Sequence, residues 1–181
     1  LLRRVRTFGF HLATLDVRQN ADVHREIVGR ALAEDDWCDR SAEERRLRLG
    51  AALERDESPT AGLDAAAKRA LWVFEAMEFC AHRYGTAAIG SYVVSMATDV
   101  DDVLSVLLLA QWAGLADGPD GVVPLDVAPL FESAGALEDG GTIVARLLAD
   151  PVYRAHLATR GNRQIVMIGY SDSNKSIGIA A

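Results

Sequence analysis

The stretch Tyr92-Val-Val-Ser-Met-Ala97 is followed by Thr98-Asp-Val-Asp-Asp102 and then by Val103-Leu-Ser-Val-Leu-Leu-Leu-Ala-Gln-Trp-Ala113. Its first part is almost continuously apolar, which is typical of a parallel strand that is buried on both faces. Acidic residues then stand where a helix would begin, and Gly114 stands where it would end. The stretch therefore predicts a buried strand that a short turn joins to a helix.

Three other short apolar runs have the same character, at residues 9–16, 127–131 and 164–170. Long helical patterns lie between these runs, so strands and helices alternate along the chain. That alternation predicts an α/β fold with parallel strands. Four strand–helix units amount to about half of a (β/α)₈ barrel. We therefore expect a helix-rich chain with about four parallel strands that forms part of a TIM-type barrel.

A large helical insertion is expected between the first two strands, at about residues 21–90 of one partial barrel domain that covers residues 1–181. The charged residues 43–48 are assigned to a solvated helix face, and Ser41 and Glu44 have the spacing of a capping box at its start. Two apolar stripes at helical spacing predict core positions. They are Val23, Ile27, Ala31 and Leu32, and then Leu63, Ala67, Ala70, Phe74, Met77 and Cys80.

The composition is that of an ordinary globular protein: among 181 residues half are hydrophobic and a quarter are charged, with a net charge of −7. The acidic balance disfavours a nucleic-acid surface and a polybasic membrane anchor, and no apolar run approaches the ~20 residues that span a bilayer. Two cysteines without metal-site spacing favour a reducing compartment. Because the sequence opens at Leu1 without a signal peptide, we expect an internal segment of a longer protein.

Polar residues stand at the ends of three predicted strands, in Asp16-Val-Arg-Gln19, Phe131-Glu132 and Gly169-Tyr-Ser-Asp-Ser-Asn-Lys175. The carboxyl ends of parallel barrel strands line a single mouth, so we expect their polar side chains to converge there. These side chains are Arg18, Glu132, Asp172 and Lys175.

Two carboxylates without a His or Cys partner favour a hard divalent ion, Mg²⁺ or Mn²⁺. Arg18 and Lys175 add positive charge that suits an anionic substrate. Salt bridges at a barrel rim are the alternative interpretation of the same residues, and spacing alone leaves it open.

The four histidines are weaker candidates. His11 lies in an apolar run and is expected to be a hydrogen-bonded core residue. Three others fall in helical patterns and are expected to face solvent or a neighbouring helix: His24, His82 and His156. The sequence contains no convincing Ser/His/Asp or Cys/His arrangement for nucleophilic catalysis.

Four segments resemble motifs of phosphoenolpyruvate carboxylase and occur in that family's order. Phe8-Gly-Phe-His-Leu-Ala-Thr-Leu-Asp-Val-Arg-Gln-Asn20 resembles its Asp-[Ile/Val]-Arg-Gln segment, and Ser91-Tyr-Val-Val-Ser-Met-Ala97 resembles its Tyr-Val-Ile-Ser-Met-Ala. Val127-Ala-Pro-Leu-Phe-Glu132 is similar to Pro-Leu-Phe-Glu, and Val166-Met-Ile-Gly-Tyr-Ser-Asp-Ser-Asn-Lys175 to Gly-Tyr-Ser-Asp-Ser-x-Lys. The chain departs from the family at Ser176-Ile177, where an Asp and a small residue are usual.

The resemblance implies a cytoplasmic carbon–carbon lyase, a homotetramer at full length. It would convert phosphoenolpyruvate and bicarbonate to oxaloacetate and phosphate with Mg²⁺ or Mn²⁺, and so supply the tricarboxylic acid cycle. By motif position, Glu132 and Asp172 would bind the metal. Arg18 would hold the substrate phosphate, and Lys175 would assist on the bicarbonate side.

The family's catalytic His and its mobile Gly/Arg-rich loop belong to other parts of the enzyme, so the isolated segment is expected to be inactive. No nucleic-acid or membrane partner is expected. Two alternatives remain: another metal-dependent barrel enzyme that acts on an enolate, or a helical scaffold without chemistry, which the helical stretch 23–83 would support.

Overall fold

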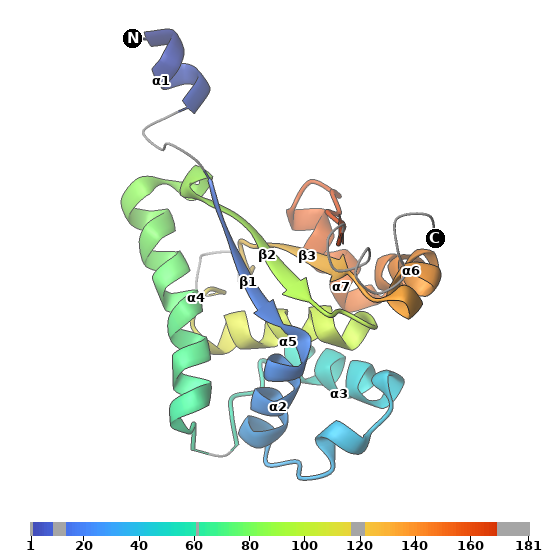
Figure 1. Ribbon diagram of the computed structural model, residues 1–181. Coiled ribbons are helices and arrows are strands. Elements are labelled where there is room, and N and C mark those ends of the chain that lie inside the picture. The colour runs from blue at the N-terminus through green and yellow to red at the C-terminus, as the bar shows by residue number, and fades with distance from the viewer. Residues whose placement is uncertain (1, 9–13, 61, 117–121, 170–181) are drawn as a thin grey trace.

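The computed structural model of the chain describes residues 2–8, 14–60, 62–116 and 122–169. At its centre lies one parallel sheet in the order β1-β2-β3-β4, which Figure 1 shows above helix α5. The strands are β1 (Leu15–Asn20), β2 (Ile89–Ser95), β3 (Asp126–Phe131) and β4 (Met167–Ile168). The predicted α/β class with four parallel strands is thereby confirmed.

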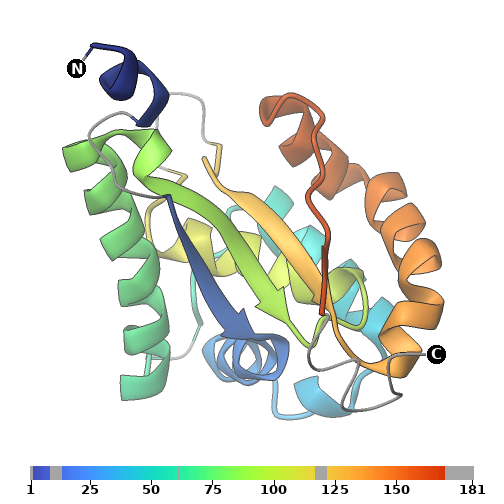
Figure 2. The ribbon, with the colours of Figure 1, turned by 45° about the horizontal axis from the view of Figure 1, so that its top comes forward.

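Helices pack behind and beside this sheet (Figure 2), and the near face of the strands carries no helix within the described part of the chain. The first and last strands are not neighbours in the sheet order, so closure into a TIM-type barrel stays a prediction. The helices are α1 (Leu2–Phe8), α2 (Ala21–Leu32), α3 (Ala42–Glu54), α4 (Ala65–Tyr84), α5 (Val100–Trp112), α6 (Ala134–Ala149) and α7 (Pro151–Thr159), with 3₁₀ turns η1 (Trp37–Asp39) and η2 (Thr86–Ala88).

Helix α5 is the centre of the core, and every residue from 100 to 110 is buried. Asp99 caps its first turn in a capping box with Asp102, which satisfies backbone N–H groups that have no partner inside the helix. Gly114 has φ +84°, a left-handed conformation that favours glycine, just past the helix end. The strand–turn–helix unit predicted from this stretch is confirmed.

Helices α2, α3 and α4 follow β1 and precede β2, where the helical insertion was expected; its status as an insertion in a barrel domain stays a prediction. The capping box of Ser41 and Glu44 is confirmed. Two expectations were wrong in part. Val23 is 37% exposed, because only the other three members of its stripe face the core. Arg45 does not belong to a solvated face: its Nε donates a 2.6 Å bond to the buried carboxylate of Asp101.

The second apolar stripe packs as predicted at Phe74 and Met77, while Cys80 is only partly buried. Helix α6 begins at Ala134, where Ser133 caps it, and Gly140 allows close packing against Phe131. Asp150 caps α7, and a proline occupies the first position of that helix. Among the helices of the described ranges, none is long and apolar enough to cross a membrane.

Strand β1 corrects the sequence analysis most clearly. The apolar run 9–16 was expected to form the first strand, but the strand covers Leu15–Asn20, and residues 9–13 lie outside the described residues. Its burial pattern runs from exposed to half-buried, and β1 lies at the end of the sheet order, where β2 is its only neighbouring strand in the described chain. A criterion based on continuous apolar character cannot find such a strand. Strand β4 is shorter than the predicted run 164–170, whose last residue is also outside the described ranges.

Candidate active site

The face of the sheet away from the helices carries two of the predicted site residues. Arg18 in β1 pairs with Val93 in β2, and Val93 pairs with Ala128 in β3. Paired residues of neighbouring strands point to the same side, and alternate residues along a strand share a face. Glu132, which follows β3 directly, therefore shares this face with Ala128 and Leu130. Val93, Ala128 and Leu130 form a small apolar cluster beneath the two polar side chains.

Arg18 and Glu132 are in direct contact. Nη2 of Arg18 donates to Oε1 and to Oε2 of Glu132, each at 3.1 Å. The Glu132 side chain is only 5% exposed, whereas that of Arg18 is 52% exposed. A buried carboxylate requires a compensating positive charge or hydrogen-bond donors, and Arg18 supplies both. The two residues lie 114 positions apart, and the parallel sheet brings them together.

A third group at this edge of the sheet is a backbone amide. Met96 is the first residue after β2, and its N–H donates to Oε1 of Glu132 at 3.2 Å. Its φ of +56° lies in the left-handed region, which is unusual for a residue other than glycine. Sequence reasoning missed this contact, because any residue type can donate a backbone hydrogen bond.

Gly169 packs closely against the backbone of Glu132. It is the first residue after β4, and its N–H donates to the Phe131 carbonyl at 2.9 Å. A Cβ atom at this position would lie 2.5 Å from Glu132 Cβ and 3.1 Å from Glu132 Cα. Only glycine fits so close to the neighbouring backbone. Met96, Glu132 and Gly169 therefore form one row, each directly after a strand.

Asp172 and Lys175 lie outside the described residues, as do Ser176 and Ile177. Their predicted convergence with Arg18 stays a prediction. Within the described ranges, no group of three or more His, Cys, Asp or Glu side chains could hold a metal ion. Glu132 nevertheless fits a hard divalent cation by its donor chemistry, because it offers carboxylate oxygens at the carboxyl edge of a parallel sheet.

A buried network of charges lies behind the turn that carries Met96. Asp101 and Asp102, in the first turn of α5, are 2% and 1% exposed. Arg45 pairs with Asp101 at 2.6 Å and Arg25 pairs with Asp102 at 2.8 Å. Burial, and next the charge of Asp102, raises the pKa of Asp101 to about 6, against the opposing effect of Arg45. The network ties α2 and α3 of the helical region to α5.

The histidines do not join the site. His24 was expected to face solvent or a helix, but it is fully buried, with Nε2 2.8 Å from the Tyr92 hydroxyl of β2. Burial lowers the pKa of His24 to about 4, so its ring is neutral at pH 7. His156 is also buried, and burial is the main reason that its pKa is about 4. His82 is exposed on α4, as expected, and His11 lies outside the described residues.

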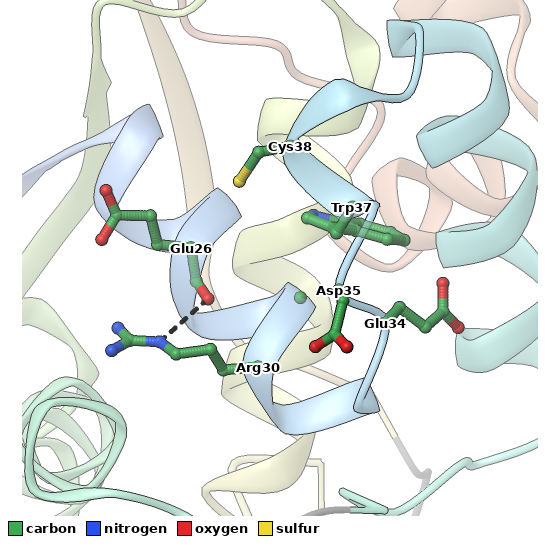
Figure 3. Close-up of a pocket in the computed structure, with 7 residues that line it drawn as sticks. Glu26, Arg30, Glu34, Asp35, Trp37 and Cys38 are labelled. Carbon is green, nitrogen blue, oxygen red and sulfur yellow. Dashed lines mark hydrogen bonds between the residues drawn. The ribbon is translucent and has the colours of Figure 1, made fainter.

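A surface pocket lies apart from these residues, between α2 and the segment that leads into η1 (Figure 3). Glu26 and Arg30 line it from α2, and Arg30 Nε donates to the Glu26 carbonyl at 3.3 Å. Glu34 on its rim pairs with Arg48 at 2.7 Å and with Arg40. The Glu34 carboxylate is thus already matched by two arginine side chains of the protein.

Comparison with known proteins gives a consistent result along the whole chain. The family model for phosphoenolpyruvate carboxylase matches residues 1–181. The chain is 50% identical over 181 residues to the phosphoenolpyruvate carboxylase of Xanthomonas oryzae pv. oryzae, and 44% identical over 194 residues to that of Mycobacterium avium. Each comparison covers 100% of the chain and 20% of the relative. The chain thus spans about a fifth of the length of these curated relatives.

Proposed function

The chain belongs to the phosphoenolpyruvate carboxylase family, and we propose that it contributes part of the active site of an enzyme that carboxylates phosphoenolpyruvate with bicarbonate, giving oxaloacetate and phosphate. The contact between Arg18 and Glu132 carries the proposal, because it joins a cation and a carboxylate at the carboxyl edge of a parallel sheet. Active sites of parallel α/β folds lie at this edge.

Glu132 is proposed as a metal ligand, with Asp172 as the second carboxylate. A bound Mg²⁺ or Mn²⁺ would stabilise negative charge that develops on the enolate oxygen of the substrate. The burial of Glu132 suits this role, since a carboxylate held by Arg18 and the Met96 amide keeps one orientation. Its 5% exposure also limits competition from water.

Arg18 is proposed to hold the substrate phosphate. Among the described residues its guanidinium contacts Glu132 through Nη2 alone, so Nε and Nη1 remain available for an anionic group. Half of the side chain is exposed, on the face of the sheet that no described helix covers. A planar guanidinium can present two parallel N–H donors to phosphate oxygens, which a lysine ammonium cannot do.

The remaining roles follow from the family. Lys175 is proposed to assist on the bicarbonate side, and the full-length enzyme to be a cytoplasmic homotetramer that supplies the tricarboxylic acid cycle. These proposals rest on the match to the family over residues 1–181.

The test is made in the full-length enzyme. Glu132→Gln keeps the size of the side chain and removes its charge, so Mn²⁺ should bind at least about tenfold more weakly, and kcat should fall. Electron paramagnetic resonance of free Mn²⁺ measures binding directly, and a coupled assay of oxaloacetate measures the rate. Glu138→Gln in helix α6 is the matched control, since it removes one carboxylate away from the sheet edge. Equal Mn²⁺ affinity in both variants would refute the assignment of Glu132.

A further inference from the structure

The turn between β2 and α5, residues 96–99, presents a backbone group to Glu132. The Met96 N–H lies 3.2 Å from Glu132 Oε1, and Met96 holds a left-handed φ of +56°. A residue with a Cβ atom remains in this conformation only where its surroundings hold it. The position of this amide therefore depends on what fixes the rest of the turn.

Asp102 fixes the turn from the side of α5. Its Oδ2 accepts from the Thr98 amide at 2.8 Å, from the Thr98 hydroxyl at 3.1 Å and from the Asp99 amide at 3.4 Å. Three donors from two consecutive residues converge on one carboxylate oxygen. Thr98 lies two residues after Met96, so this oxygen anchors the short segment that carries the amide.

Asp102 is itself held in place by Arg25. Nη2 of Arg25 donates to the other oxygen, Oδ1, at 2.8 Å, where the Asp102 side chain is 1% exposed and that of Arg25 is 19% exposed. A second bond of 2.8 Å, from Nη1 to Asp22, fixes the guanidinium on α2. Charge-assisted bonds in a buried setting hold their geometry more firmly than exposed ones. A continuous chain of contacts therefore runs from Arg25 to Glu132.

We propose that Arg25 is a positioning residue for Glu132, acting through Asp102 and the Met96 amide. The proposal rests on the proposed function in one respect, because it takes Glu132 as a metal ligand. Arg25 touches neither Glu132 nor Arg18; it sets the orientation of the carboxylate by holding the turn. The outer contacts of a metal ligand commonly change metal affinity tenfold or more when they are removed.

The helical region offers a matched control in Arg48 of α3. Its side chain is 25% exposed, close to the value for Arg25, and it also bonds two carboxylates, with Nε 2.7 Å from Glu34 and Nη2 2.6 Å from Glu57. Neither partner belongs to the turn or to α5. Loss of Arg48 likewise removes contacts to two carboxylates, which are 18% and 27% exposed against 1% for Asp102, and leaves the chain from Arg25 to Glu132 intact.

The experiment compares Arg25→Gln, Arg25→Lys and Arg48→Gln in the full-length enzyme by Mn²⁺ binding, kcat and the midpoint of thermal unfolding. Arg25→Gln should weaken Mn²⁺ binding about tenfold. Arg25→Lys should retain part of that affinity, because it keeps a positive charge next to Asp102. Arg48→Gln should lower the unfolding midpoint less, because its partners are more exposed, and leave Mn²⁺ affinity within about twofold of wild type.

Thr98→Val is the second variant, in case Arg25→Gln does not fold. It removes only the 3.1 Å hydroxyl bond to Asp102 and should weaken Mn²⁺ binding severalfold. If Thr98→Val and Arg25→Gln both bind Mn²⁺ as tightly as Arg48→Gln does, the proposal is overturned. If Glu132→Gln also binds Mn²⁺ like wild type, the proposed function fails. If Glu132→Gln loses Mn²⁺ binding while the Arg25 and Thr98 variants bind Mn²⁺ like wild type, only the positioning role of Arg25 fails.

Discussion

Gly169→Ala should disturb the site more than its single added methyl group suggests. The new Cβ would lie 2.5 Å from Glu132 Cβ and 3.1 Å from Glu132 Cα. Ordinary contact begins at 3.4 Å, so the two segments must separate by about 0.9 Å. Rotation of a side chain cannot provide this space, because a Cβ and a Cα move only with their backbone.

A separation of that size exceeds what the neighbouring hydrogen bonds tolerate. The bond from the Met96 amide to Glu132 is already 3.2 Å long, and the bond from the Gly169 amide to Phe131 is 2.9 Å long. Overpacking of this kind costs about 1–3 kcal/mol. We therefore expect a lower unfolding midpoint and, because Glu132 is displaced, a loss of Mn²⁺ affinity of about tenfold.

Gly141→Ala in helix α6 is the control. A Cβ there meets nothing within 4 Å, and alanine favours a helix over glycine by roughly 0.5–1 kcal/mol. Thermal unfolding and Mn²⁺ titration of the full-length enzyme compare the two variants. The steric reasoning is refuted if Gly169→Ala matches Gly141→Ala in both measurements.

Two further predictions concern Arg18 and His24. Arg18→Lys keeps the charge but loses the planar pair of donors, so the KM for phosphoenolpyruvate should rise about tenfold in steady-state assays; an unchanged KM would make Arg18 a structural ion-pair partner only. The pKa of His24 is about 4 in the folded protein, against 6.5 for the ordinary side chain, so between these values the unfolded chain binds a proton that the folded chain does not. The free energy of unfolding therefore falls as the pH drops from about 6.5 to 4, by up to about 3 kcal/mol. The midpoint of thermal unfolding of His24→Gln should depend less on pH across that window than wild type, whereas the exposed control His82→Gln should keep the wild-type dependence.

Short-range signals explain why parts of the fold were predictable from the sequence. The capping box of Ser41 and Glu44 and Gly114 after α5 act within a few residues, so the local sequence alone contains the signal. Strand β3 was found within one residue because it is buried on both faces, and continuous apolar character is a reliable sign of that setting.

Strand β1 and the buried charges were not predictable in the same way. The sequence of β1 is mostly polar, and the strand lies at the end of the described sheet, exposed to half-buried along its length. Arg45 and His24 have the residue types of a surface position. Their burial depends on Asp101 and Tyr92, which are 56 and 68 residues away along the chain. No local pattern reports a partner at such a distance.

The candidate site shows the same division. Positions after predicted apolar strands singled out Arg18 and Glu132 as candidates. In the structure only Glu132 directly follows its strand, whereas Arg18 lies within β1. Only the tertiary structure showed that the two residues touch, that a left-handed Met96 turns its amide toward Glu132, and that Gly169 leaves no room for a side chain. The sequence gives the type of each residue. The hydrogen bond from the Met96 amide and the lack of space at Gly169 arise only when strands that are distant in the sequence lie side by side.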